Sequence, residues 1–308
     1  MSKIIKIGTR DSELALWQAN TVKNKLENLG YKTQLIQVKS IGDLVLDKPL
    51  YELGITGIFT KTLDVAILNG DIDIAVHSMK DVPTLLPKGM MQVAVLERAA
   101  VEDILVHKEN SEFLNSERSI PITIATGSLR RKAQWLNKYP NHHLVDLRGN
   151  VNTRLKKLED NKWNGAIFAK AGLERINLIP KNHIVLDWMT PAPAQGAMMV
   201  VAMKNDEFSK KALLNLNHHE TEICTQIERD FLRELEGGCT APIGAIAKIE
   251  NENIIFKGVL FSLDGKDKIE VEKIITINSY KDAGKVCAQE VLENGGKELM
   301  SQIKEELK

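Results

Sequence analysis

The chain has 308 residues, of which 43% are hydrophobic, with 41 basic and 41 acidic residues. This length predicts two or three domains of about 100–150 residues each, and the hydrophobic content is sufficient for globular cores. The balanced charge argues against a general binder of nucleic acid or of membrane surfaces, which needs a basic excess. No signal-peptide pattern and no long apolar span is visible. We therefore expect a cytoplasmic protein without nucleic-acid or membrane partners.

Strand and helix patterns alternate through the first hundred residues. Residues 3–9 form an apolar strand pattern, and Ser12 can cap a helix that runs to about Leu29. A second strand pattern, a second helix and a third strand follow at 33–39, about 58–69, and 72–77. Strands that alternate with helices predict an α/β lobe with a largely parallel sheet.

The same alternation returns after residue 102. The expected elements are a strand at 122–126, a helix capped by Ser128, a strand at 144–147, a helix from Asn150 to Leu158, and a strand at 165–169. Residues 102–191 are therefore expected to form a second α/β lobe. The segment PAPAQG interrupts the pattern at 191–196, and the apolar run 197–203 predicts a strand that returns to the first lobe. The first lobe then comprises 1–98 and 196–218.

The pattern changes again in the last third of the chain. A helix is expected at about 221–235, followed by strands at 243–249, 253–261 and 268–276 with turns between them. A final helix is expected at 280–306, with a break at Gly295–Gly296. Residues 220–308 are therefore expected to form a small α+β domain.

The arginines are few and clustered. Only 10 of the 41 basic residues are Arg, and five of these ten lie between residues 130 and 175. Several stand where a strand passes into a helix, and free N–H groups at a helix start together with guanidinium groups favour carboxylate or phosphate. The alternative is ordinary surface or inter-lobe salt bridges. No phosphate-loop or GxGxxG motif is present. The candidate anion-binding arginines are Arg10, Arg130, Arg131, Arg148, Arg154 and Arg175.

A second candidate is HSMKDVP, which directly follows the predicted strand 72–77. His77, Lys80 and Asp81 leave the sheet at its carboxyl end, and Pro83 stiffens the exit. A carboxylate there can stabilise a developing cation or transfer a proton. The alternative is a polar loop with an internal Lys–Asp pair.

The three cysteines are sparse and odd in number, which indicates reduced thiols. Cys239 follows Gly237–Gly238 in EGGCTAPIG, so it is expected on an accessible loop, as a nucleophile or attachment point. The alternative is a small packed residue at a domain junction, which fits Cys224 and Cys287 better. The run His218–Glu220 is interpreted as a helix cap or surface segment, and no metal site is expected.

Taken together, these segments resemble the hydroxymethylbilane synthase family, also called porphobilinogen deaminases. The matching segments occur in the family's order and cover nearly the whole chain. They are IGTRDSELALWQA, GDIDIAVHSMKDVP, ATGSLRRKAQ, LRGNVNTRLKKL, AGLERI, PAPAQGA, LNHHET and LEGGCTAPIGA.

The resemblance implies two lobes like those of periplasmic binding proteins and a smaller α+β third domain. It also implies head-to-tail condensation of four porphobilinogen molecules with loss of ammonia, then hydrolytic release of hydroxymethylbilane. A dipyrromethane cofactor is expected on a thioether to Cys239, with Asp81 as the catalytic residue and a monomeric protein. The cofactor is expected to contact Lys80, Asp81, Ser128, Arg130 and Arg131, and the substrate carboxylates are expected to meet Arg10, Ser12, Arg148, Arg154 and Arg175.

The chain departs from the family pattern at three positions: Thr56 stands where a Lys is usual, Val201 where an acidic residue is usual, and Ala194 where Gly is usual. We expect these departures to affect lid dynamics or rate more than chemistry. Repeated elongation at one site predicts lobe motion around 98–102 and 191–196. Two other functions fit parts of the pattern: a non-catalytic two-lobe binder of small polycarboxylate anions, and an enzyme acting on phosphorylated ligands.

Overall fold

The computed structural model describes residues 3–39, 60–108, 114, 122–235 and 241–307. These residues fall into two compact units. The first contains 3–39, 60–99 and 195–223, and the second contains the other described residues.

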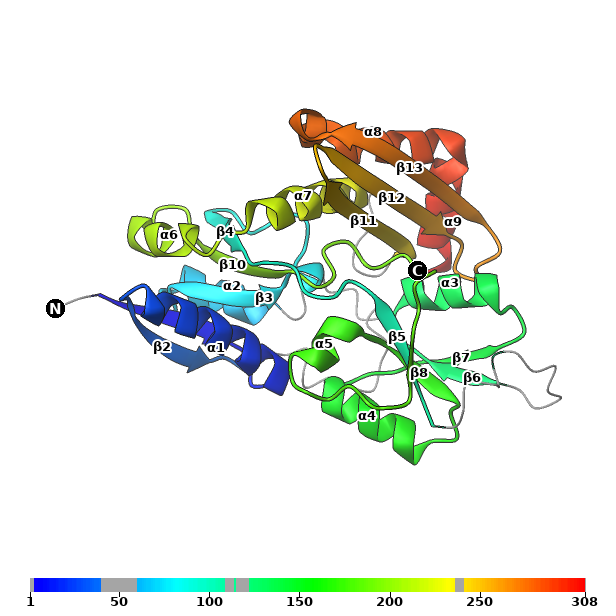
Figure 1. The fold of residues 1–308 in the computed structure, drawn as a ribbon, viewed down its shortest axis with the longest axis horizontal. Coiled ribbons are helices and arrows are strands. Elements are labelled where there is room, and N and C mark those ends of the chain that lie inside the picture. Colours follow the sequence, from blue (N-terminus) through cyan, green and yellow to red (C-terminus); the bar gives the residue numbers. More distant parts are fainter. Residues whose placement is uncertain (1–2, 40–59, 109–113, 115–121, 236–240, 308) are drawn as a thin grey trace. The chain divides into compact units, whose positions relative to one another are not determined.

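The first unit is built on a five-stranded sheet (Figure 1). Its strands are β1 (Ile4–Thr9), β2 (Lys32–Gln37), β3 (Ile74–Ser78), β4 (Met90–Val95) and β10 (Met198–Met203), in the order β2-β1-β3-β10-β4. Strand β1 pairs in parallel with β2 and β3, whereas β10 is antiparallel to both β3 and β4. The carboxyl ends of β1 and β3 therefore lie at the same edge of the sheet.

Helices cover both faces of this sheet. Helix α1 (Glu13–Asn28) begins at Ser12, whose side chain accepts a hydrogen bond from the Ala15 amide at 3.4 Å. The apolar side chains of α1 and those of α6 (Glu207–Leu214) pack against side chains of the strands in one hydrophobic core cluster. Helix α2 (Lys61–Leu68) packs on the other face, where Gly8 leaves room for the Leu63 side chain.

The second unit contains another five-stranded sheet. Its strands are β5 (Asp103–His107), β6 (Thr123–Ala125), β7 (His143–Val145), β8 (Gly165–Ala169) and β9 (His183–Val185), in the order β7-β6-β8-β5-β9. Helix α3 (Leu129–Lys138) covers one face through the fully buried Trp135. Helices α4 (Val151–Asp160) and α5 (Lys170–Glu174) contribute to the core cluster on the other face.

The same unit carries an antiparallel three-stranded sheet of β11 (Ile243–Glu250), β12 (Asn253–Phe261) and β13 (Lys268–Thr276). Helix α7 (His219–Glu234) packs its Phe231 against Phe256, with ring centroids 5.2 Å apart. The chain ends with the 3₁₀ segment Ile277–Asp282, α8 (Ala283–Val291), a π turn at Leu292–Gly296, and α9 (Lys297–Glu306).

The expected fold class is confirmed: two α/β sheets with helices, followed by a small α+β module. The predicted helix starts at Ser12, Ser128 and Asn150 are confirmed, as is the break at Gly295, which has φ of 96°. The return of 197–203 to the first sheet is also confirmed, by β10. The predicted division into 1–98 with 196–218, 102–191 and 220–308 stays a prediction.

The expectation of largely parallel sheets is confirmed for strand direction. In each five-stranded sheet four strands run in the same direction, and one strand, β10 or β5, runs opposite to them. The parallel neighbours β1–β2 and β6–β7 are each joined through a single helix, α1 or α3, which returns the chain in the same direction. Strand β10 reaches its sheet only after the chain has passed through the second unit, so no such crossover fixes its direction.

Candidate active site

Asp81 lies at the carboxyl end of β3. The strand passes at Ser78 into one turn of 3₁₀ helix, Met79–Asp81. The buried Met79 donates its amide to the Ala197 carbonyl at 3.0 Å, and the Val82 amide returns to the Met79 carbonyl at 3.2 Å. These bonds fix the turn against the strand that follows Ala197, so the backbone position of Asp81 is set by the sheet.

A small cavity of about 70 Å³ lies beside this turn, within the first unit. It brings together three of the predicted site residues, one from the end of β1, one from the cap of α1, and one from the turn after β3: Arg10, Ser12 and Asp81. The rest of the lining is Leu14, Ala15, Gln18, Thr60, Val76, His77 and Ser78.

One residue of the cavity lining, His77, is a buried histidine with a lowered pKa. His77 is 6% exposed, and burial, with a smaller contribution from the nearby charge of Arg10, lowers the pKa of its imidazole to about 4. No described residue provides a hydrogen-bond partner for its Nε2. Gln18, from α1, donates from Nε2 to the Ser78 hydroxyl at 2.8 Å. The cavity therefore combines a cation, a carboxylate and a neutral imidazole.

Lys80 is not in the cavity lining. Its Nζ donates to Oε1 of the fully buried Gln195 at 3.2 Å, and Arg98 donates from Nε to the Gln195 carbonyl at 2.8 Å. The segment PAPAQG, in which the sequence indicated only a break, thus supplies one partner of Lys80.

In the second unit, two predicted arginines surround one buried carboxylate. Asp103 is fully buried at the start of β5 and accepts hydrogen bonds on Oδ1 from Arg131 Nε at 3.1 Å and Nη2 at 2.8 Å. Its Oδ2 lies 2.7 Å from Arg130 Nη2. Arg131 also donates from Nη1 to the Ile167 carbonyl at 3.0 Å. Sequence reasoning missed Asp103, because a single acidic residue at the start of an apolar strand is common on surfaces.

Arg130 extends this network. Its Nη1 donates to the Thr190 carbonyl at 2.6 Å, and Gln134 holds both the amide and the carbonyl of Thr190, at 2.8 and 2.9 Å. Ser128 caps α3 by accepting from the Arg131 amide at 3.4 Å. The alternative interpretation, that the arginines form salt bridges, thus applies to Arg130 and Arg131. Their salt bridge to Asp103 is, however, buried and lies within one unit. Carboxylate binding by Arg130 and Arg131 stays a prediction.

The other predicted arginines of this unit follow strand and helix ends. Arg148 is 6% exposed in the turn between β7 and α4, and Arg154 donates from Nε to the Gly149 carbonyl at 2.7 Å. Gly149 has φ of 112°, a conformation that favours glycine. Burial lowers the pKa of Arg175 to about 10, although the negative charge of Glu174 acts in the other direction and raises it.

Cys239 and Thr56 lie outside the described residues. Helix α7 and strand β11 flank the Cys239 segment, and a fully buried carboxylate joins them. Glu228 of α7 accepts from the Ala247 amide on Oε1 at 2.8 Å and from the Ala194 amide on Oε2 at 2.6 Å. Ala194, where the family usually has Gly, adopts φ of 61°. The sequence did not single out Glu228.

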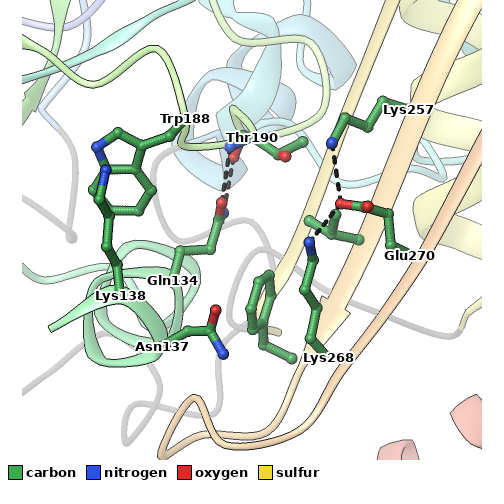
Figure 2. Close-up of a pocket in the computed structure, with 10 residues that line it drawn as sticks. Gln134, Asn137, Lys138, Trp188, Thr190, Lys257, Lys268 and Glu270 are labelled. Carbon is green, nitrogen blue, oxygen red and sulfur yellow. Dashed lines mark hydrogen bonds and ion pairs between the residues drawn. The ribbon is translucent and has the colours of Figure 1, made fainter. Parts of the chain in front are cut away.

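Figure 2 shows a second cavity, of about 210 Å³, that lies wholly in the second unit. Lys257 and Lys268 reach Glu270 from the two sides, at 3.0 and 2.7 Å, and the Lys138 ammonium lies 4.4 Å from the Trp188 ring centroid. None of the predicted site residues lines this cavity. It touches the arginine network only through Thr190 and Gln134.

Two further features concern metals and membranes. At the start of α7, His218 Nδ1 lies 2.9 Å from the Thr221 hydroxyl, and His219 has a 74% exposed side chain. The described residues contain no group of three or more candidate metal ligands. Among the helices described, none has the length and apolar character needed to span a bilayer.

Comparison with known proteins gives matches along the whole chain. Residues 5–211 match the family model "Porphobilinogen deaminase, dipyromethane cofactor binding domain", and residues 222–293 match "Porphobilinogen deaminase, C-terminal domain". The porphobilinogen deaminase of Chlorobium phaeobacteroides is 38% identical, over 99% of each chain, and that of Campylobacter hominis is 39% identical, over 98% of each. A probable porphobilinogen deaminase of Methanocaldococcus jannaschii is 44% identical over 82% of this chain and 86% of its own.

Solved structures give weaker similarity. The methionine binding protein MetQ aligns with 69% of this chain and 89% of its own, with a TM-score of 0.45 and 15% identity. The probable amino-acid transporter binding protein ytmK of Bacillus subtilis aligns with 70% of this chain and 92% of its own, with a TM-score of 0.42 and 14% identity.

Proposed function

The chain belongs to the porphobilinogen deaminase family, and we propose that it joins four porphobilinogen molecules head to tail and releases hydroxymethylbilane. It is a transferase of tetrapyrrole biosynthesis, as its family is, and it carries the family's dipyrromethane cofactor-binding domain. The observation that carries this function is the match of both family domains along one chain, at 38–39% identity to full-length relatives. A non-catalytic binder of polycarboxylates is not favoured, because it explains neither the cofactor domain nor the C-terminal domain.

The cavity beside Asp81 suits the substrate's charges. Porphobilinogen has an acetate, a propionate and an aminomethyl group that is cationic at neutral pH. Arg10 and Ser12 offer a guanidinium and a hydroxyl for a carboxylate, whereas Asp81 offers the opposite charge in the same cavity. The positions of these groups support binding of a molecule that carries both charges.

Asp81 is proposed as the catalytic residue. When ammonia leaves, the carbon–nitrogen bond breaks with its electron pair on nitrogen, and an electron-poor azafulvenium remains on the substrate. A carboxylate beside the pyrrole N–H stabilises this cation, and its effect is strong where water is excluded. The short turn after β3 fixes the backbone position of Asp81 at the cavity.

The cofactor is proposed to be bound to Cys239 through a thioether, with contacts from Lys80 and Asp81 in the first unit and from Ser128, Arg130 and Arg131 in the second. When bound, the dipyrromethane supplies the pyrrole carbon onto which the chain is built. The donor set fits such a group, because a dipyrromethane made from substrate has several carboxylates. Asp103 holds the guanidinium groups of Arg130 and Arg131 in place, and Arg130 Nε has no hydrogen-bond partner among the described residues, so it remains as a donor for such a group.

The growing chain adds two carboxylates with each unit. We assign these to Arg148, Arg154 and Arg175, together with Arg10 and Ser12, because guanidinium groups bind carboxylates in a planar fork that Lys cannot form. Lobe motion around 98–102 and 191–196 would let one catalytic residue serve every addition. A cytoplasmic location and a monomeric state complete the proposal.

Intact mass tests the cofactor assignment. After incubation with porphobilinogen, the wild-type chain is expected to gain the mass of two linked pyrrole units, and Cys239→Ala is expected to remain at its bare mass. Cys224→Ala is the matched control and should keep the adduct, because Cys224 is buried in α7. A wild-type protein that stays at its bare mass and makes no hydroxymethylbilane would refute the function.

Turnover tests the role of Asp81. Asp81→Asn should keep the adduct but lose most of the activity, because an amide cannot stabilise the cation as a carboxylate does. Asp71→Asn changes an exposed carboxylate just before β3 and serves as the control. Turnover near the wild-type rate in Asp81→Asn would contradict the catalytic role.

A further inference from the structure

The imidazole of His77 is buried at the wall of the active-site cavity, and no role in the proposed reaction has been given to it. The residue lies on β3, in register with Met199 of the antiparallel strand β10. Its side chain is 6% exposed and lines the cavity with Arg10, Ser12 and Asp81. The pairing with β10 fixes the backbone of His77 in the sheet.

Its Nε2 lacks a partner among the described residues. Buried polar atoms are nearly always hydrogen-bonded, and exceptions in native structures call for an explanation such as a functional role. Here the nitrogen belongs to a residue that borders a cavity with charged groups of both signs. Because Nε2 is itself buried, a ligand in that cavity supplies the missing hydrogen bond when the imidazole ring turns towards it.

The ring is neutral at physiological pH. Burial, and then the charge of Arg10, lower the pKa of His77 to about 4, so the imidazole has one N–H donor and one acceptor nitrogen. Arg10 lines the same cavity as the ring. An anion bound to Arg10 is then close to His77, whereas Asp81 provides the negative end of the same cavity.

We propose that His77 is a further substrate-binding residue, whose Nε2–H donates a hydrogen bond to the porphobilinogen carboxylate held by Arg10. This inference rests on the proposed function and adds a residue to its substrate site. A neutral donor adds a directional bond to the carboxylate without adding a second positive charge to the cavity. The side chain at the end of the predicted strand 72–77 then contributes to substrate specificity.

The test uses the cofactor-loaded enzyme and a substrate analogue that lacks the aminomethyl group, a pyrrole with one acetate and one propionate. Binding is measured by calorimetry in the wild type, His77→Met, His77→Gln and His143→Gln. His77→Met removes both ring nitrogens but keeps an apolar side chain, and it is expected to weaken binding by about 10–100-fold. His77→Gln keeps a donor near the Nε2 position and should stay within about threefold of the wild type. His143, which is exposed on β7, is the control and should have no effect.

Kinetics with porphobilinogen separates binding from chemistry. His77→Met is expected to raise KM with kcat changed by less than about threefold, because the bond to the carboxylate is made equally in the ground and transition states. An analogue affinity in His77→Met within threefold of the wild type would overturn the inference. A fall in kcat with unchanged analogue affinity would also overturn it, since it would assign the ring to the departing aminomethyl group.

A measurement on the unmutated protein covers the case in which His77→Met does not fold or take up cofactor. In wild-type enzyme with ¹⁵N-labelled histidine, analogue binding should shift the His77 Nε2–H proton downfield. An unchanged His77 signal at saturating analogue would contradict the inference. A wild-type protein that forms no tetrapyrrole would instead refute the proposed function, so the two failures are distinguishable.

Discussion

Asp103→Asn is the substitution whose effect follows most directly from the structure. The carboxylate is fully buried and is the shared partner of Arg130 and Arg131, with N–O distances of 2.7–3.1 Å. The amide that replaces it has nearly the same shape, so packing changes little. What changes is the charge, because two buried guanidinium groups lose their counter-ion.

The expected cost is large because both arginine side chains are almost completely buried. The Arg130 and Arg131 side chains are only 4% and 7% exposed. Removing one partner of a buried ion pair costs about 3–5 kcal/mol of unfolding free energy. At roughly 2–4 °C per kcal/mol for a domain of this size, the Tm should fall by roughly 6–20 °C. Burial already lowers the pKa of Arg130, which shows how strongly this site disfavours an uncompensated charge.

The assay is urea unfolding followed by fluorescence of Trp135 and Trp188, which lie in the same unit as Asp103. The matched control is Asp160→Asn, which breaks the exposed Lys156–Asp160 pair at 3.1 Å, with 74% and 55% exposed side chains. That pair should contribute no more than about 0.5 kcal/mol. If the unfolding free energy of Asp103→Asn is within about 1 kcal/mol of that of the wild type, the claim that the Asp103 carboxylate compensates the buried charges of the two arginines is refuted.

Four further predictions concern packing, buried polar groups, pH and chain growth. Gly258→Ala should lower the free energy of unfolding by about 1–3 kcal/mol, measured in urea, because its Cβ would lie 2.5 Å from the buried Phe231 ring. Glu228→Gln should cost about 1–3 kcal/mol, because its amide group would face a backbone N–H that now donates to a carboxylate oxygen; an unchanged urea midpoint would contradict this. The pKa of His77 is about 4 in the folded protein, against 6.5 for an unperturbed histidine, so the unfolded chain binds more protons between these values. The stability associated with the neutral ring is therefore present above pH 6.5 and is lost as the pH falls towards 4. Between pH 7 and pH 5 the wild type should therefore lose roughly 2 kcal/mol more unfolding free energy than His77→Gln. An equal loss in the two proteins would argue against the lowered pKa of His77. Arg148→Lys should impair elongation, because Lys cannot form the planar fork; mass spectrometry of the enzyme with bound pyrrole chains should then show fewer long chains, and a wild-type distribution would contradict the assignment.

The features that the sequence predicted are mostly local. Helix starts at Ser12, Ser128 and Asn150 each depend on a side chain and an amide three residues later, so they are visible in a short window. The meeting of Arg10 and Asp81 in one cavity was also predictable, because both follow the carboxyl ends of neighbouring parallel strands.

The features that the sequence did not predict depend on distant segments. The antiparallel direction of β10 follows from the path of the chain through the second unit, which no local pattern encodes. Asp103 and Glu228 look like surface carboxylates in sequence, because their burial depends on partners such as Arg131 and Ala247. His77 was predicted at the end of the strand 72–77 and the start of HSMKDVP; the structure continues the strand through Ser78, and the sequence did not indicate that the ring is buried.

The Glu228 carboxylate also has a consequence for loop closure. It joins Ala194 and Ala247, which lie 34 and 19 residues from it along the chain. A contact that closes loops of this length must offset the entropy of bringing their ends together, a task that disulfides often perform in secreted domains. Here the cross-link is made by hydrogen bonds to a carboxylate. Thiol reductants therefore do not break this cross-link between α7, β11 and the Ala194 segment.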